Sequence, residues 1–296
     1  MRLPGVYARG LAMGVADVVP GVSGGTLALI TGIYEQLITA LAGLHPRLFS
    51  VWWREGFMAF WRAGQFGFLF SLLAGIVTSI VLFARLMGWL LAFYPVPVWA
   101  FFCGLIAASV WPVWHTLREH TRREYLMFVA GGVAAATISL LPGLGHISLH
   151  PVVFLLSGAL AICAMILPGI SGSFILLLLG MYVPVLEALR HGQWLNIAAF
   201  AGGCAMGLLS FVHLLRWLLR RWHDPIMALL AGFMAGSLVK LWPWRLTPEL
   251  ATREQWLWPS HYAELAGSAM VPQALLALVA GALVVAVLFR LDGQRR

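Results

Sequence analysis

The stretch GLAMGVADVVPGVSGGTLALITGIY at residues 10–34 returns as GALAICAMILPGISGSFILLLLGMY at residues 158–182. The two stretches align without a gap, and nine of their 25 positions are identical. Each carries Pro-Gly-x-Ser-Gly in the middle of a long apolar run, where proline and glycine interrupt a helix. The chain therefore contains two similar interrupted segments, at 10–44 and 152–189.

The repeat extends beyond these two segments. At an offset of 128, residues such as Trp89 and Trp217, or Gly104 and Gly232, match. At an offset of 150, VAGG (129–132) matches VAGA (279–282), and the order of the three blocks is the same in both halves. We predict a single membrane domain, 1–296, built from repeat 1 (1–145) and repeat 2 (146–296).

The composition excludes a soluble protein. Of the 296 residues 61% are hydrophobic and only 10% are charged, and the mean hydropathy is +0.89, whereas soluble domains carry roughly 25% charged residues. The net charge of +8 comes from arginines that lie between apolar runs, which is a topology signal and not a nucleic-acid footprint. The three cysteines have no paired spacing, so we expect no metal and no cofactor.

Each half has one interrupted segment and three ordinary spans. The spans are expected at about 67–92, 97–115 and 124–142, and at about 196–219, 225–241 and 271–290. The interrupted segments allow two readings, two short spans or one re-entrant hairpin. We prefer hairpins because an arm such as 10–19 is shorter than the roughly 20 residues that a span needs.

The arginines give the orientation. Most bases fall in segments that we place in the cytoplasm, and this satisfies the positive-inside rule with both termini inside. Three crossings per half is an odd number, so the two repeats are inverted. The bases in the expected cytoplasmic segments are Arg2, Arg9, Arg47, Arg54, Arg62, Arg118, Arg122, Arg123, Arg216, Arg220, Arg221, Arg290, Arg295 and Arg296; those on the other side are Arg190, Lys240, Arg245 and Arg253.

Inverted repeats with broken helices are typical of secondary transporters, whose substrate sites lie at the repeat interface. The first N–H groups of a half-helix lack intrahelical partners and attract anions such as phosphate. We therefore expect a phosphate site where the two hairpin tips meet; the alternative is close packing in which the hydroxyls only cap helices. The predicted phosphate-binding residues are Gly21, Ser23, Gly24, Gly25, Thr26, Gly169, Ser171, Gly172, Ser173 and Arg85.

Ionisable residues inside apolar segments are costly and usually functional. Arg85 lies within the span 67–92, where its guanidinium either binds the phosphate or snorkels to the outer headgroups. Asp17, Glu35 and His213 are candidates for proton coupling. Asp17 alternatively pairs with Arg9 or contacts the helix start, Glu35 is alternatively interfacial, and His213 is alternatively a packing residue.

The sequence contains no HExxH motif and no acidic cluster for metal-dependent phosphotransfer. We therefore predict a protein that is not an enzyme.

The two interrupted stretches, GLAMGVADVVPGVSGGTLALITGIYEQLI and AICAMILPGISGSFILLLLGMY, resemble the PopT-type family of bacterial polyprenyl-phosphate translocases. The resemblance covers nearly the whole chain. It implies a flippase of the bacterial plasma membrane that returns undecaprenyl phosphate, the lipid carrier of envelope glycan synthesis, to the cytoplasmic leaflet. The second copy departs from the first, because Ser173 and Phe174 replace Gly25 and Thr26, so the two tips need not contribute equally.

From the residues alone other functions stay open. A transporter of a soluble anion would use the same site with a water-filled path. An intramembrane polyprenyl-pyrophosphate phosphatase would need a catalytic constellation that the sequence lacks, and a scaffold would leave the polar broken hairpins unexplained.

Overall fold

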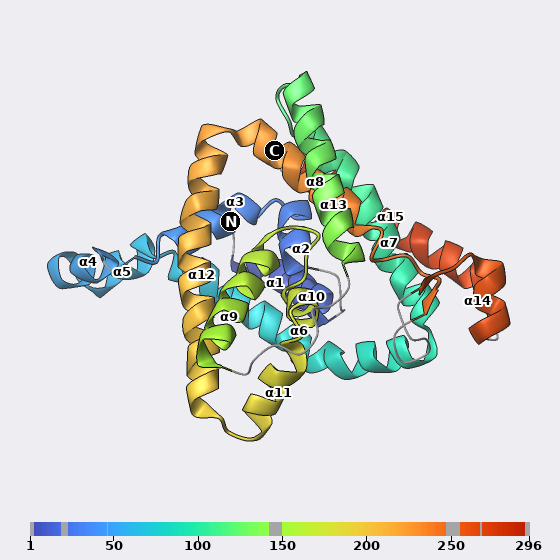
Figure 1. The fold of residues 1–296 in the computed structure, drawn as a ribbon. Helices are drawn as coiled ribbons and strands as arrows, with labels where there is room; N and C mark the ends of the chain where they lie inside the picture. The colour runs from blue at the N-terminus through green and yellow to red at the C-terminus, as the bar shows by residue number, and fades with distance from the viewer. Residues whose placement is uncertain are drawn as a thin grey trace.

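The computed structural model describes residues 3–18, 23–45, 47–141, 150–246, 255–266 and 268–293, and this part of the chain is almost entirely helical (Figure 1). The elements are α1 (Leu3–Val18), α2 (Gly24–Ile30), α3 (Tyr34–Ala42), α4 (Arg47–Glu55), α5 (Phe57–Ala63), α6 (Phe66–Phe93), α7 (Pro95–His115), α8 (Arg122–Leu140), α9 (Pro151–Ile166), α10 (Gly172–Leu178), α11 (Tyr182–Arg190), α12 (Trp194–Arg221), α13 (His223–Ser237), β1 (Arg245–Leu246), β2 (Gln255–Trp256), α14 (Pro259–Ala266) and α15 (Val271–Gly293).

Helix lengths recur in the two halves. α1 and α9 have 16 residues each, α2 and α10 have seven, α3 and α11 have nine, and α6 and α12 have 28. The first three pairs begin 148 residues apart and the fourth begins 128 apart, which are the offsets of the sequence repeat. The order and length of these elements therefore follow the repeated sequence.

Each interrupted segment contains a second break that the sequence analysis did not predict. α2 and α3 are bent by 117° relative to each other, and α10 and α11 are bent by 103°. Gly32 and Gly180 lie at these bends with φ of 70° and 63°, in the left-handed region that favours glycine. Both copies of the sequence have a glycine at this position. The chain bends sharply there because α3 and α11 turn away from α2 and α10 to pack against other parts of the molecule.

Four helix pairs form the body: α1 with α6, α9 with α12, α7 with α15, and α8 with α13. Glycines allow these backbones to touch, because a Cβ on Gly75 would overlap the Tyr7 carbonyl and one on Gly203 would overlap the Leu155 carbonyl. Gly104 meets Leu278 and Gly232 meets Phe128 in the same way. Small residues at crossings are the usual means of close helix packing in membranes. Two of the four pairs join the halves, since α7 and α8 each pack on a helix of repeat 2.

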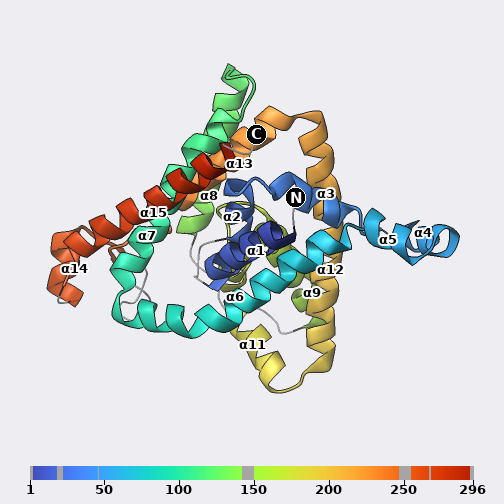
Figure 2. The ribbon, with the colours of Figure 1, turned by 180° about the vertical axis from the view of Figure 1, so that it is seen from behind.

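The largest apolar core surrounds hairpin 1, the hairpin of repeat 1, which consists of α1, α2 and α3. Ala28, Ile33, Tyr34 and Ile38 are buried in it, together with residues of α7 and α13. The hairpin of repeat 2 (α9, α10 and α11) has a smaller cluster of its own around Phe154 and Met181. α4 and α5 project from the body as a separate arm (Figures 1 and 2).

The described residues include three helices long and apolar enough to cross a membrane, or up to five if each bent pair counts as one span. The expected spans correspond to α6, α7, α8, α12, α13 and α15, although α13 ends at Ser237, before the predicted limit of 241. The chain is a multi-pass membrane protein. The loop after α13 adds a two-residue antiparallel ribbon, β1–β2, that the sequence analysis did not predict.

Candidate anion site at the hairpin tips

Hairpin 1 begins its second arm with a closed set of polar contacts. Ser23 is the N-cap of α2, and its hydroxyl accepts a hydrogen bond from the Gly25 N–H at 3.1 Å. The Gly24 N–H donates to the Asp17 carboxylate at 2.7 Å. An anion thus already lies at the start of α2, as expected for unpaired N–H groups at the positive end of a helix. Of the alternatives for Asp17, the structure has the contact with the helix start.

The glycines of this tip are required by packing. A Cβ on Gly24 would lie 2.7 Å from Asp17 Oδ2, and a Cβ on Gly25 would lie 2.7 Å from the Ile166 carbonyl oxygen. Both distances are too short for a real side chain. Gly24 therefore lets the carboxylate reach the backbone, and Gly25 lets α2 reach the end of α9.

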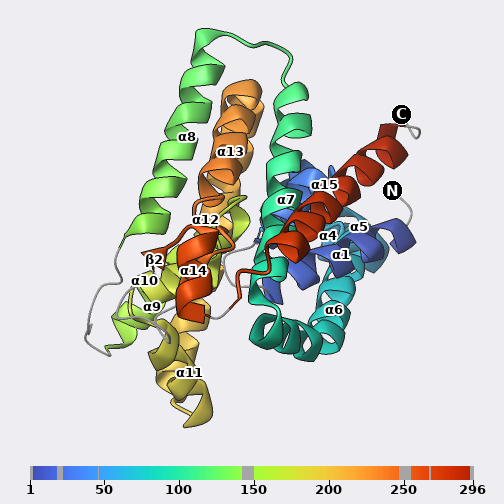
Figure 3. The same cartoon turned by 90° about the vertical axis from the view of Figure 1, so that its right-hand side faces the viewer.

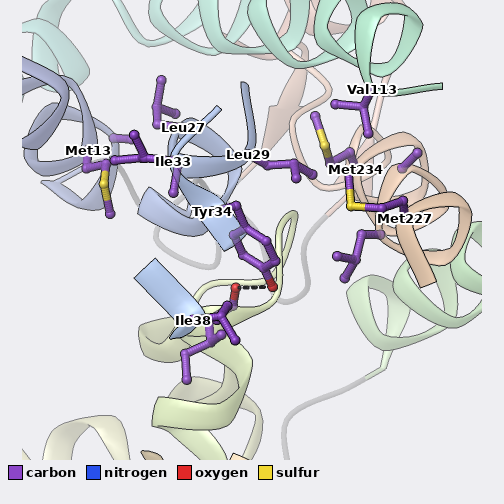
Figure 4. Packing of buried hydrophobic residues seen from close by; sticks show 14 of the residues in the cluster. Met13, Leu27, Leu29, Ile33, Tyr34, Ile38, Val113, Met227 and Met234 are labelled. Carbon is purple, nitrogen blue, oxygen red and sulfur yellow. Dashed lines mark hydrogen bonds between the residues drawn. The ribbon is translucent and has the colours of Figure 1, made fainter. Parts of the chain in front are cut away.

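The two hairpins are joined through hydroxyl groups of repeat 1. The Ser23 hydroxyl donates to the Met165 carbonyl at 3.1 Å, and the Thr26 hydroxyl accepts from the Gly169 N–H at 2.8 Å. The Tyr34 hydroxyl donates to the Ile166 carbonyl at 3.2 Å, the dashed contact in Figure 4. These side chains are buried. They satisfy the broken backbone after α9, which irregular structure at membrane depth requires.

Hairpin 2 presents a different tip. Ser171 is the N-cap of α10 without a side-chain cap bond, and its hydroxyl is 2.8 Å from that of Ser173. Gly169 has φ of 87°, and a Cβ there would lie 2.6 Å from the Phe233 carbonyl oxygen, so the loop is pressed against α13. The structure brings both tips together, as predicted, but most of the hydroxyls in hairpin 1 bind protein groups, whereas the Ser171–Ser173 pair bonds to itself.

Several predicted residues lie elsewhere. Gly21 is outside the described residues. Arg85 is exposed on α6, and no contact joins it to either tip among the described residues. His213 is exposed on α12, with Nδ1 2.6 Å from the Leu209 carbonyl oxygen. Neither residue is part of the tip cluster in this structure.

Glu35 belongs to an ionic cluster at the far end of hairpin 1. Its carboxylate lies 2.9 Å from His223 Nε2, and His223 Nδ1 lies 2.8 Å from Asp224. Asp224 also accepts hydrogen bonds from the N–H groups of Arg118 and Glu119, in the turn before α8. Partial burial lowers the pKa of His223, but its bonds to Asp224 and Glu35 outweigh this, and the net pKa is raised.

One cation near the second tip was missed. The Lys240 ammonium lies 4.4 Å from the centroid of the Phe174 ring in α10, and Arg245 donates to the Lys240 carbonyl at 2.6 Å. Lys240 is the single lysine among nineteen bases and lies at the end of an apolar span, which was the available signal. Its position beside α10 depends on how α13 packs, which the sequence did not show.

Among the described residues, no group of three or more His, Cys, Asp or Glu side chains is arranged to hold a metal ion.

Comparison with known proteins decides the family. A family model described as undecaprenyl phosphate translocase-like matches residues 13–256. The chain belongs to this family. The match begins within α1 and ends with β2, so it covers hairpin 2 and most of hairpin 1 and leaves out α14 and α15. It confirms the resemblance that the two interrupted stretches carry.

Two curated relatives of this translocase-like family are similar over most of their length. A protein of Vibrio cholerae named polyprenyl-phosphate transporter is 48% identical over 247 residues, covering 83% of this chain and 80% of the relative. A Staphylococcus aureus protein of the same name is 32% identical over 252 residues, covering 79% and 84%. Both are named as transporters, in agreement with the prediction that this chain is not an enzyme. No solved structure matches the chain significantly.

Proposed function

We propose that this protein is a flippase that returns undecaprenyl phosphate from the outer to the cytoplasmic leaflet of the bacterial plasma membrane, by alternating access, for reuse as a lipid carrier in envelope glycan synthesis. The relatives' name, polyprenyl-phosphate transporter, supplies the substrate class. The observation that carries the proposal is the meeting of two broken helices inside the molecule, where Ser23 bonds to the end of α9 and Thr26 bonds to the loop after it.

The phosphate is proposed to bind at the two tips, with hairpin 2 in the larger role. The hydroxyls of Ser171 and Ser173 bond to each other, so a phosphate oxygen can replace that bond without breaking the junction between the hairpins. Lys240, beside Phe174, supplies positive charge close to this tip. Ser23, Gly25, Thr26 and the Gly169 N–H hold the tips together. Moving a bare phosphate through hydrocarbon is prohibitive, and such a site lowers that barrier.

Asp17 is the proposed link to protons. Its carboxylate accepts the hydrogen bond from the Gly24 N–H, which a phosphate oxygen could otherwise accept. The carboxylate and the phosphate therefore compete for the start of α2. Protonation of Asp17 would weaken this bond and reduce its repulsion of the phosphate. Glu35 and His213 remain further candidates for coupling.

The proposed membrane arrangement is two inverted repeats, each with one re-entrant hairpin and three crossings, and both termini in the cytoplasm. It is supported by the matching helix lengths and by the distribution of arginines among the segments between the spans. In Figure 3 the end of α15 and the α7–α8 turn lie toward one side, and α11 and α14 lie toward the other.

The test is movement of a fluorescent polyprenyl phosphate between leaflets of liposomes that contain the purified protein. We expect Ser171→Ala with Ser173→Ala to abolish most of the movement while the protein remains folded. Asp17→Asn, which keeps an acceptor for the Gly24 N–H, should leave movement that no longer responds to a proton gradient. Movement that survives the double serine change would refute the site, and a parent protein that moves no lipid would refute the function.

The same preparation separates the alternatives. Saturable uptake of a water-soluble phosphate or carboxylate would favour a soluble-anion transporter, and release of phosphate from polyprenyl pyrophosphate would favour a phosphatase.

A further inference from the structure

The last helices of the two hairpins have the same length but different neighbours. α3 packs on α12, which belongs to the other repeat. The corresponding pair in the opposite sense is α11 with α6, and these two helices, both within the described residues, make no contact of the extent that α3 and α12 make. Figure 3 shows α11 standing apart from α6 at the edge of the molecule. One of two equivalent contacts is extensive and the other is not.

Side-chain exposure follows this difference. Tyr34 and Ile38 of α3 are 2% and 1% exposed, whereas their repeat counterparts Tyr182 and Leu186 of α11 are both 37% exposed. On the receiving helices, Leu215 and Leu219 of α12 are buried, whereas their counterparts on α6, Met87 and Leu91, are only partly buried. α6 and α11 thus carry apolar side chains at the positions whose counterparts on α12 and α3 are buried in one apolar cluster.

The α3–α12 contact includes an ion pair that the corresponding positions of α11 and α6 lack. Glu35 at the start of α3 pairs with His223, directly after α12. The residues at the equivalent positions are Val183 and Pro95, which cannot pair. α11 also covers an apolar cavity of about 170 Å³, lined by Phe154, Val185, Ala188, Leu189, Ile197 and Phe200. α11 therefore borders an apolar cavity, whereas α3 lies in the main core.

We propose that the protein changes state by exchanging these contacts: α3 leaves α12 as α11 docks on α6. The structure described here is the state closed on the arginine-rich side, and polyprenyl phosphate enters from the membrane between α6 and α11. This inference rests on the proposed function for the identity of the lipid, but the exchange itself does not. Broken hairpins of inverted repeats exchange roles in this way when one repeat rocks against the other.

Two cysteine pairs at equivalent positions test the exchange. Cys103, Cys163 and Cys204 are first replaced by serine, and the variant must still fold as a monodisperse protein. Pair A is Glu35→Cys with His223→Cys, and pair B is Val183→Cys with Pro95→Cys. A short bis-maleimide is applied to each pair in liposomes, and Val183→Cys with Ser71→Cys, at the opposite end of α6, is the negative control.

We expect pair A and pair B each to crosslink, each crosslink to stop lipid movement, and the negative control not to crosslink. In a variant carrying both pairs, no single molecule should carry both crosslinks by mass spectrometry. Absence of the pair B crosslink in protein that moves lipid, or both crosslinks in one molecule, would overturn the exchange. Mutually exclusive crosslinks in a parent protein that moves no lipid would instead overturn the proposed function and leave the exchange standing.

Discussion

Hairpin 1 and hairpin 2 have nearly the same local structure, but they pack in different surroundings. Their helices have equal lengths and break at matching residues, yet α2 and α3 lie in the main core while α10 and α11 form a smaller cluster at the side. Three positions differ between the copies. Thr26, which is Phe174 in hairpin 2, bonds to the Gly169 N–H of hairpin 2. Gly25, which is Ser173 in hairpin 2, leaves room for the end of α9, and Asp17, which is Met165 in hairpin 2, holds the start of α2. The two copies of the motif can therefore have different roles. Hairpin 1 fixes the junction between the hairpins, and hairpin 2 is left to bind the phosphate.

The largest expected effect comes from adding a single methyl group to hairpin 1. In Gly25→Ala the new Cβ would lie 2.7 Å from the Ile166 carbonyl oxygen, so α2 must withdraw from α9. Overpacking of this kind costs about 1–3 kcal/mol. We expect a lower midpoint of thermal unfolding in detergent and loss of lipid movement. Ser173, at the equivalent position, already has a Cβ, and Ser173→Ala should unfold at the parental temperature; equal loss in both variants would contradict the division of roles.

The second comparison uses the paired tyrosines. Tyr34→Phe removes the hydrogen bond to the Ile166 carbonyl inside the core, and an unsatisfied buried polar group costs about 1–3 kcal/mol. Tyr182 is 37% exposed and makes no hydrogen bond from its hydroxyl to another described residue, so Tyr182→Phe should change stability little. Thermal unfolding monitored by tryptophan fluorescence measures both. A greater loss from Tyr182→Phe would show that hairpin 2 is the more firmly held of the two.

The ionic cluster at the start of α3 predicts a pH dependence that hairpin 2 lacks. The pKa of His223 is raised above its ordinary 6.5 in the folded protein, so its contribution to stability is complete below that value and is lost as the pH rises through the raised pKa. We expect the unfolding midpoint of the parent to fall over this range and the fall to flatten in His223→Gln. His261→Gln, in exposed α14, is the control that should keep the parental slope. An unchanged slope in His223→Gln would show that the ion pairs of His223 do not stabilise the fold.

Much of this arrangement could be predicted from the sequence, because it depends on residues close together in the chain. The repeat, the breaks at Pro-Gly-x-Ser-Gly and the limits of α6 and α12 follow from local composition and periodicity. The second bend at Gly32 and Gly180 and the proximity of Lys240 to Phe174 depend on packing between distant helices. Arg85 is a predicted site residue because charge inside a span is costly, but an arginine that reaches the headgroups relieves this cost as one that binds a ligand does, so the sequence does not separate the two.

The smallest expected effect is therefore at Arg85. Its side chain is exposed on α6, away from both tips, so Arg85→Ala should reduce lipid movement only modestly, through weaker attraction of the phosphate as the lipid approaches α6. Lys240→Gln removes the positive charge beside Phe174 and should slow movement more. Initial rates in liposomes at matched protein content give the ranking. If Arg85→Ala were the more damaging change, the phosphate would have to meet α6 within the transport path, and α6 would line that path instead of bordering its entrance.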